Sequence, residues 1–315
     1  MQMKHVVVIG GGTGTFTVLN ALKKYPINLS AIVTMADDGG STGMLRDQYG
    51  VLPTGDVRRA LVALSDSEGI LRELFNYRFK EGGLHGHSFG NLFLAALEKI
   101  TGDFTTALRE ASELLNINGE VVPVTLDDVR LYAELEDGKV LRGETQIDIP
   151  RSSLRMPIKK IWLEPEAKMN PSVRRVLHHA DLIIMGPGDL YTSVIPNLLV
   201  KGVPEAIKAS KAKKVYLANL MTKFGETHGF SANDFVEKME KYLGKDVLDY
   251  AVFNNKKPAA ALLKKYKKEQ AEFVSPEGLN KKSKKPKYIL ADLLDSDGLI
   301  RHSQKKLAKV ILSLL

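Results

Sequence analysis

Near its start the chain carries the stretch Val6-Val7-Val8-Ile9-Gly10-Gly11-Gly12-Thr13-Gly14-Thr15. Its four β-branched residues predict a buried parallel strand, because strands covered on both faces are apolar without alternation. The following glycines lead into a helical pattern over residues 15–24, and residues 29–35 predict a second strand. A strand, a glycine-rich turn, a helix and a second strand form the opening unit of a doubly wound α/β sheet.

The glycine-rich turn is suited to an anion. Glycines let the backbone approach a ligand closely, and a helix N-terminus presents amides and a positive dipole. Thr15 stands where the dinucleotide fingerprint G-x-G-x-x-G has its third glycine, and no Walker-type lysine follows. A tight turn without a ligand is the alternative. We expect the turn to hold a phosphate or diphosphate at Gly10, Gly11, Gly12, Thr13, Gly14 and Thr15.

Composition excludes several classes of protein. The 315 residues are 44% apolar and 26% charged, which is ordinary for a globular chain. Cysteine is absent, which excludes disulfides, thiolate metal centres and cysteine nucleophiles. The apolar runs are far shorter than the ~18 residues of a membrane span, and the start lacks the apolar segment of a signal peptide. We therefore expect one α/β domain over residues 1–315, located in the cytoplasm.

The net charge of +8 is concentrated in one place. Residues 256–287 contain eleven lysines, no arginine and three glutamates, within a lysine-rich excursion over residues 254–287. A solvated lysine-rich face is the plain interpretation. The shortage of arginine and aromatic residues disfavours nucleic acid as a partner.

The rest of the chain predicts a Rossmann-like three-layer α/β sandwich with a mainly parallel sheet. A polar, glycine-rich connection is expected over residues 36–55, and helices over residues 56–64, 69–79, 91–100, 104–115 and 304–315. Strand-like segments at residues 121–125, 129–135, 140–149 and 159–163 predict a small β insertion over residues 120–164. Further strands of the main sheet are expected at residues 181–185, 215–219, 247–253 and 289–294.

Two acids, Asp37 and Asp38, follow the second predicted strand. An acid in this place commonly accepts a hydrogen bond from a ribose hydroxyl. The pair could instead bind Mg²⁺ beside a phosphate, or form a solvated turn. Carboxyl ends of adjacent parallel strands border one crevice, so the pair and the glycine turn are expected to share a ligand.

Three further loops carry candidate residues. The segment Gly86-His87-Ser88-Phe89-Gly90 matches a hydrolase nucleophile elbow, but no strand precedes it, so Ser88 is more simply a helix cap or a ligand contact. His85 and His87 make only a weak case for a metal site. The loops after two later strands are expected to face the same crevice, with contacts from Gly186, Gly188, Asp189, Tyr191, Thr192, Ser193, Asn219 and Thr222.

Seven motifs in order resemble a known family: Val8-Ile9-Gly10-Gly11-Gly12-Thr13-Gly14, Ala36-Asp37-Asp38-Gly39-Gly40-Ser41-Thr42-Gly43, Leu52-Pro53-Thr54-Gly55-Asp56-Val57-Arg58, Gly86-His87-Ser88-Phe89-Gly90-Asn91, Ala180-Asp181-Leu182-Ile183, Gly186-Pro187-Gly188-Asp189-Leu190-Tyr191-Thr192-Ser193 and Asn219-Leu220-Met221-Thr222. The chain resembles the bacterial YvcK-type gluconeogenesis factors. These belong to the CofD-like superfamily, which includes 2-phospho-L-lactate transferases. The likeness runs nearly end to end and includes Ile300-Arg301-His302.

The resemblance implies a Rossmann-like fold in a cytoplasmic bacterial protein. The YvcK branch is associated with cell shape and wall synthesis on gluconeogenic carbon sources, and with binding UDP-sugars such as UDP-N-acetylglucosamine. The transferase branch moves a phospholactyl group from a guanosine diphosphate conjugate, with Mg²⁺. Residues 52–56 stand where the transferases carry an acidic stretch containing Pro-Asp, which favours the YvcK branch.

Two functions remain open. In the first, a non-catalytic regulator binds a nucleoside-diphosphate sugar. The amides of residues 11–15 hold the diphosphate, Ser88, Asn91 and the 186–193 loop add contacts, and Arg301 is a charge partner. A protein partner, reached through residues 256–287, and a homo-oligomer are both compatible with this reading.

In the second function, the chain is a Mg²⁺-dependent transferase of a phosphoryl-linked group, with Asp37 and Asp38 on the metal. Mg²⁺ is the one cofactor that the sequence suggests. An NAD-dependent dehydrogenase is disfavoured by the broken fingerprint.

Overall fold

A seven-stranded sheet forms the centre of the computed structural model, which describes residues 3–66, 69–150, 155–280, 284–295 and 298–315. All neighbouring strands in it are parallel, in the order β10-β9-β8-β7-β1-β2-β3. The strands are β1 (His5–Gly10), β2 (Asn28–Val33), β3 (Glu120–Pro123), β7 (Leu182–Met185), β8 (Lys213–Leu217), β9 (Tyr250–Asn254) and β10 (Lys287–Ala291).

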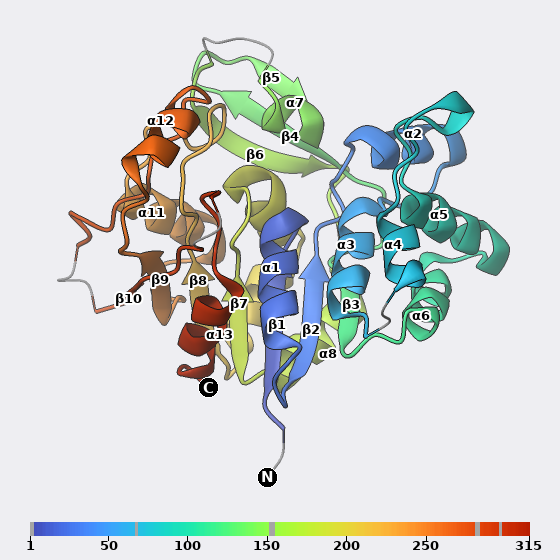
Figure 1. Cartoon of the computed structure of the whole chain (residues 1–315), viewed down its shortest axis with the longest axis horizontal. Helices are drawn as coiled ribbons and strands as arrows, with labels where there is room; N and C mark the ends of the chain where they lie inside the picture. Colours follow the sequence, from blue (N-terminus) through green and yellow to red (C-terminus); the bar gives the residue numbers. More distant parts are fainter. Residues whose placement is uncertain (1–2, 67–68, 151–154, 281–283, 296–297) are drawn as a thin grey trace.

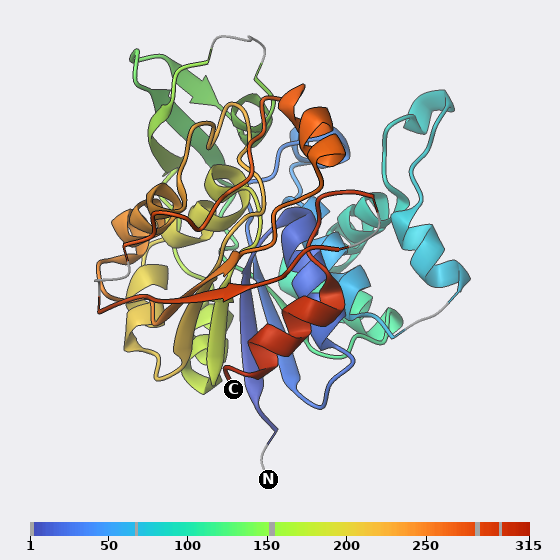
Figure 2. The ribbon, with the colours of Figure 1, turned by 60° about the vertical axis from the view of Figure 1, so that its left-hand side comes forward.

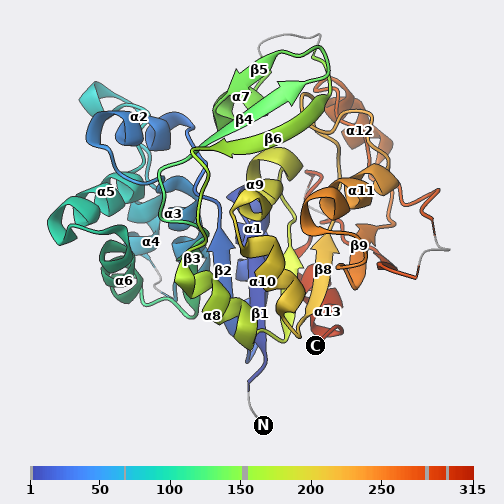
Figure 3. The ribbon, with the colours of Figure 1, turned by 180° about the vertical axis from the view of Figure 1, so that it is seen from behind.

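Helices cover both faces of this sheet. Figure 1 shows α1, α3 and α13 on one face, and Figure 3 shows α8, α10 and α11 on the other. The α-helices are α1 (Gly12–Leu22), α2 (Gly40–Tyr49), α3 (Gly55–Leu64), α4 (Ile70–Asn76), α5 (Phe89–Thr101), α6 (Phe104–Leu114), α7 (Glu144–Asp148), α8 (Pro171–His179), α9 (Ile195–Leu199), α10 (Val203–Ala209), α11 (Ala232–Leu243), α12 (Ala260–Lys267) and α13 (Gln304–Leu312). A 3₁₀ turn covers Gly82–Leu84 and a π-helix covers Leu190–Val194. The predicted three-layer α/β fold is therefore confirmed.

The chain reverses its direction across the sheet between β1 and β7. From β1 the strands proceed through β2 to β3, whereas from β7 they proceed the other way to β10. Val8 faces Ala31 of β2 on one side and Ile184 of β7 on the other, and all three side chains are buried. Open α/β sheets bind ligands at the carboxyl ends of the strands beside such a reversal.

A second, three-stranded antiparallel sheet lies above those carboxyl ends (Figure 1). It consists of β4 (Arg130–Leu135), β5 (Val140–Arg142) and β6 (Ile158–Glu164). Its strand β4 alternates between buried and half-buried residues, as expected where one face is covered. The small sheet carries the short helix α7 over the edge of the main sheet.

Three segments differ from the sequence-based expectation. Strand β3, grouped with the β insertion at residues 120–164, pairs with β2 in the main sheet, and its buried run lacks alternation. Residues 144–148 form α7 rather than a strand, because Gly143 adopts a φ of 94° and turns the chain. Residues 36–55 contain α2 rather than only a loop.

Helix α2 is held by a buried arginine. Arg46 is 4% exposed, and its guanidinium donates to the backbone oxygens of Asp37 and Val129 at 2.9 and 2.7 Å and contacts the Asp128 carboxylate. These bonds tie the helix to the acidic loop after β2 and to the start of β4. These long-range hydrogen bonds leave no mark on the apolar pattern of residues 36–55, so the sequence could not predict helix α2.

The lysine-rich excursion over residues 254–287 has two separate parts. Figure 2 shows α12 near the carboxyl ends of the sheet, while β10 starts at the opposite end. Residues 281–283 lie outside the described residues. Within the described ranges, no helix combines the length and apolar character needed to cross a bilayer.

Replacing Arg46 with Met is expected to lower the free energy of unfolding by about 2–4 kcal/mol, because a buried carbonyl oxygen, a half-buried one and a carboxylate lose their donor. Urea unfolding followed by circular dichroism measures the change. The matched control is Arg109→Met, which removes an exposed guanidinium beside Glu110 and is expected to change the free energy by less than about 0.5 kcal/mol. Equal losses in the two variants would contradict the role given to Arg46.

Candidate functional site

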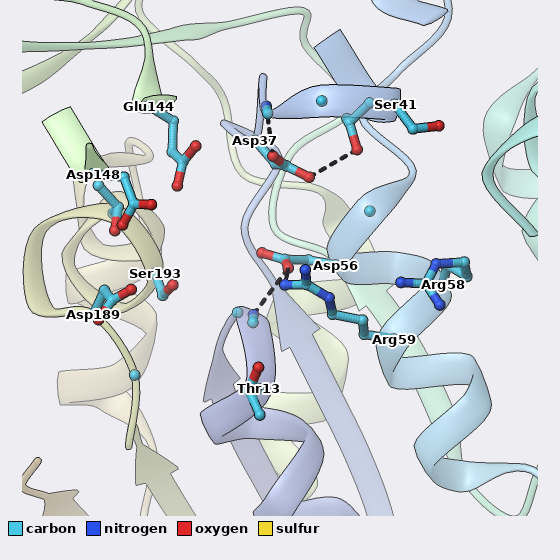
Figure 4. A pocket seen from close by; sticks show the side chains of 18 of the residues that line it. Thr13, Asp37, Ser41, Asp56, Arg58, Arg59, Glu144, Asp148, Asp189 and Ser193 are labelled. Atoms are coloured by element: carbon cyan, nitrogen blue, oxygen red, sulfur yellow. Dashed lines mark hydrogen bonds and ion pairs between the residues drawn. The ribbon is translucent and has the colours of Figure 1, made fainter. Parts of the chain in front are cut away.

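A cavity of about 400 Å³ lies at the carboxyl ends of β1, β2 and β7. Its walls come from the glycine turn after β1, the acidic loop after β2, the start of α3, the helix α7 and the loop after β7. Figure 4 shows carboxylates on both sides of the cavity, with Arg58 and Arg59 on one side and Thr13 below. The cavity is therefore at the predicted place and is strongly polar.

The glycine turn forms the floor of the cavity. Gly11 is the N-cap residue of α1 and has no side chain to accept hydrogen bonds from the first amides of the helix. The amide of Gly12 donates to the Asp56 carboxylate at 2.9 Å. Thr13 and Gly14 also line the cavity. The arrangement leaves the positive end of α1 facing the cavity, which suits an anion.

Three acids from separate elements converge on the cavity. The Asp37 carboxylate accepts from the Gly39 amide and the Thr42 hydroxyl, both at 2.9 Å. Burial raises its pKa. Burial, together with the charge of Asp37, raises the pKa of Asp56 to about 6. Burial, together with Asp37 and other nearby carboxylates, raises the pKa of Glu144 to about 9.

Arginines supply the positive charge. Arg58 is buried, and burial, with Arg59 and Arg78 nearby, lowers its pKa to about 10. Its Nε donates to the Asn91 side chain at 3.0 Å. Arg59 lies 3.4 Å from the Asp56 carboxylate. The cavity thus combines cations that can bind phosphate with carboxylates that can bind a metal ion.

The structure brings ten of the predicted site residues together around this cavity. They are Gly11, Gly12, Thr13, Gly14, Asp37, Asn91, Gly188, Asp189, Thr192 and Ser193. Asp38 makes other contacts: its carboxylate accepts from the amide and hydroxyl of Thr145 at 2.8 and 2.9 Å. It thereby ties α7 to the loop after β2.

Several predicted residues lie behind the residues that line the cavity. Thr15 and Ser88 are buried, and their hydroxyls have no hydrogen-bond partner among the described residues. The amide of Tyr191 donates to the Glu226 carboxylate at 3.0 Å. Thr222 is paired with Glu272 through two hydrogen bonds. Gly10 is the last residue of β1 and Gly186 directly follows β7, and neither lines the cavity.

A second cavity of about 210 Å³ adjoins the first and contains the predicted residues Asn219 and Arg301. Both cavities are lined by Thr13, Gly14, Gly188 and Asp189. Asn219 Oδ1 and His302 Nε2 are buried without a hydrogen-bond partner among the described residues. Burial lowers the pKa of His302 to about 4, so its ring is neutral at pH 7.

A salt-bridge cluster fixes the loop after β7. Carboxylate oxygens of Asp148, Asp189 and Glu226 lie within 4.8 Å of one another. The ammonium of Lys223 lies 2.8 Å from Asp189 and 3.3 Å from Glu226, and also contacts Asp148. Glu226 is buried, and its pKa is raised to about 8 by burial and by Asp189. Lys223 already provides the cation for this acidic group.

Sequence reasoning missed several lining residues. Asp56 and Arg58 belong to a motif that carries the family resemblance, so that motif could have identified them. Glu144 and Asp148 lie on a segment predicted as a strand. Only the placement of α7 over the main sheet brings them to the cavity.

A doubly wound α/β fold with a glycine-rich turn and a polar cavity at its reversal point is typical of a broad class of ligand-binding proteins. The profile of the family described as 2-phospho-L-lactate transferase CofD matches residues 6–294, and the chain belongs to this family.

Relatives that are named gluconeogenesis factors are similar to this chain along their full length. The chain is 44% identical over 323 residues to the "Putative gluconeogenesis factor" of Aquifex aeolicus, covering 100% of this chain and 98% of the relative. It is 41% identical over 317 residues to the "Gluconeogenesis factor" of Bacillus subtilis, covering 100% and 99%. A crystal structure of a UPF0052-family protein from Bacillus halodurans has a TM-score of 0.94 and 41% identity, covering 99% of each chain.

The raised pKa of Glu144 makes stability depend on pH. The carboxyl has a pKa of about 9 in the folded chain and of about 4.3 when unfolded. Between these values the folded state binds more protons, so the free energy of unfolding falls as the pH rises. We expect Glu144→Gln to lose less stability than the wild type between about pH 5 and about pH 9, by roughly 1–3 kcal/mol.

Urea unfolding at several pH values measures this difference. Glu113→Gln, at an exposed position of α6, is the control and is expected to follow the wild type. Parallel pH profiles for the wild type and Glu144→Gln would show that the Glu144 carboxyl is not protonated in the folded protein.

Proposed function

We propose that the chain binds a nucleoside-diphosphate sugar across the two adjoining cavities and acts as a regulator. The observation that carries the proposal is their shared wall at the N-terminus of α1, formed by Thr13, Gly14, Gly188 and Asp189. A diphosphate is the part of such a ligand that a helix N-terminus stabilises, and its two substituents extend in different directions. Each substituent then occupies one cavity.

The larger cavity takes the diphosphate together with Mg²⁺. Asp56 is a buried carboxylate and Asp37 a half-buried one, and both have raised pKa values, so a dication would favour their ionised forms. Carboxylate oxygens are hard ligands of the kind that Mg²⁺ prefers. The donor set therefore fits Mg²⁺, which would neutralise charge between the acids and the diphosphate. Arg59 supplies a further positive charge at the same wall.

The smaller cavity takes the nucleoside. Tyr266 provides an aromatic surface there, and a base can stack on such a ring. The unpartnered acceptors Asn219 Oδ1 and His302 Nε2 require donors from the ligand. The imide N–H of uracil and the ribose hydroxyls are such donors. UDP-N-acetylglucosamine meets these requirements, with the sugar in the larger cavity.

The proposed role is to report the supply of cell-wall precursor during gluconeogenic growth, with effects on cell shape. The names of the relatives that match along their full length support a role connected with gluconeogenesis. A protein partner would receive the signal.

An enzymatic alternative is Mg²⁺-dependent transfer of a phosphoryl-linked group. The family description supports it, and so does the cluster of carboxyls with perturbed pKa values in one cavity. With a pKa of about 9, Glu144 is protonated at pH 7 and can donate a proton or a hydrogen bond.

Calorimetric titration of the chain with UDP-N-acetylglucosamine, with and without Mg²⁺, tests the proposal. GDP and NADH are the comparators. We expect uridine-selective binding that is tighter with Mg²⁺, with the ligand recovered intact. Binding of GDP without binding of the UDP-sugar would contradict the proposal, and turnover of a nucleotide conjugate would favour the transferase.

A substitution in the smaller cavity tests the nucleoside placement. His302→Leu removes the buried acceptor and is expected to weaken UDP-N-acetylglucosamine binding about tenfold, because a desolvated ligand donor then lacks its acceptor. His228→Leu is the matched control, since His228 also has an unpartnered buried ring nitrogen but lines neither cavity. Equal affinities of the two variants would place the nucleoside elsewhere.

A further inference from the structure

A third cavity, of about 360 Å³, lies at the amino ends of β8, β9 and β10. The described residues of its lining include one carboxylate, Asp249, and six lysines: Lys211, Lys213, Lys214, Lys284, Lys285 and Lys287. Six residue steps along and beyond β8, at a rise of ~3.3 Å each, place it about 20 Å from Asn219 in the nucleoside cavity. One small ligand cannot occupy both places.

The charge inside this cavity is poorly balanced. The Asp249 carboxylate accepts from the Lys285 ammonium at 2.6 Å and from the Lys214 amide at 2.9 Å. The ammonium groups of Lys213 and Lys214 donate to backbone oxygens, which satisfies their hydrogen bonds without neutralising their charge. The Asp249 carboxylate is therefore already paired with Lys285 and does not neutralise the other lysines.

Three lysines of the cavity are exposed. Among the described residues, no ion pair or side-chain hydrogen bond involves Lys211, Lys284 or Lys287. Burial lowers the pKa of Lys214. The charge of Asp249 opposes this effect, and the nearby charge of Lys285 adds to it. The lysines thus repel one another around a concave surface. A bound anion would remove that repulsion.

The lysines of α12 provide a contrast within the same lysine-rich excursion. Lys264, Lys265 and Lys267 are exposed in the last turns of a short helix, and they line none of the cavities described above. Solvent and counterions can screen such a convex arrangement. The cavity at the amino ends of the strands gathers its lysines from two segments far apart in the sequence, residues 211–214 and 284–287, which concentrates their field.

We propose that this cavity binds a compact polyanion that carries two or more phosphate groups. Lysine ammonium groups are flexible point charges that suit phosphate oxygens. Among the described residues, the lining has no arginine and one aromatic ring, Tyr250, so it is poorly equipped to read or stack nucleobases. Its concave shape suits a small molecule rather than a flat bilayer. The site is independent of the proposed function at the carboxyl ends.

Lysine footprinting of the whole chain tests the proposal, with inorganic tripolyphosphate as the probe. The protein is acetylated briefly at near-physiological salt, with and without the probe, and each lysine is quantified by mass spectrometry. We expect tripolyphosphate to slow acetylation of Lys211, Lys284 and Lys287 at least fivefold, and to leave Lys264, Lys265 and Lys267 nearly unchanged. This readout is specific to each site, so binding of the probe at the glycine turn does not confuse it.

A pair of triple variants gives a second measurement by calorimetry. Lys211→Gln/Lys284→Gln/Lys287→Gln is expected to abolish one class of tripolyphosphate sites, or to weaken it at least tenfold. Lys264→Gln/Lys265→Gln/Lys267→Gln makes the same change in net charge on α12 and is expected to alter affinity less than twofold. Equal effects of the two variants, equal protection of both lysine sets, or no protection at all would overturn the proposal.

Discussion

The site depends on the contact between Gly14 and the carbonyl of Pro187. A Cβ atom at Gly14 would lie 2.0 Å from the Pro187 oxygen, so only glycine permits this approach. Through this contact the start of α1 packs against the loop after β7, at the point where the chain reverses its direction across the sheet. Both cavities share this wall. Without it, the positive end of α1 would not face two adjoining cavities.

The small antiparallel sheet completes the site through electrostatics. Asp38 holds Thr145 and thereby places α7 over the carboxyl ends of the main sheet. Glu144 then enters a cavity that already contains Asp37 and Asp56, and mutual repulsion adds to the cost of burial. Such an accumulation of carboxyls lowers the stability of the fold as the pH rises from their unfolded pKa values to their raised folded ones. A bound cation or a retained proton reduces this cost, and the arrangement therefore supports the proposed ligand-binding function.

Local patterns in the sequence predict the fold and half of the site, for identifiable reasons. The apolar run at residues 6–9 and the glycines after it determine a strand, a turn and a helix within one short stretch. Strand ends of a parallel sheet converge, so loops far apart in sequence could be placed together. Helix α2 and helix α7 could not be foreseen, because α2 depends on the long-range bonds of Arg46 and α7 on those of Asp38. Tertiary contacts of this kind leave no periodic signal in the sequence.

The lysine-rich excursion illustrates the same limit for charge. As a sequence, residues 254–287 form one basic block, and a solvated face explains such a block well. The fold divides it: α12 stays beside the carboxyl ends, whereas Lys284, Lys285 and Lys287 join lysines of β8 at the other end of the sheet. Net charge per segment therefore says little about function until the backbone has gathered charges from separate segments around one cavity. That gathering gives the amino ends of the strands a polyanion site as distinct as the acidic site at their carboxyl ends.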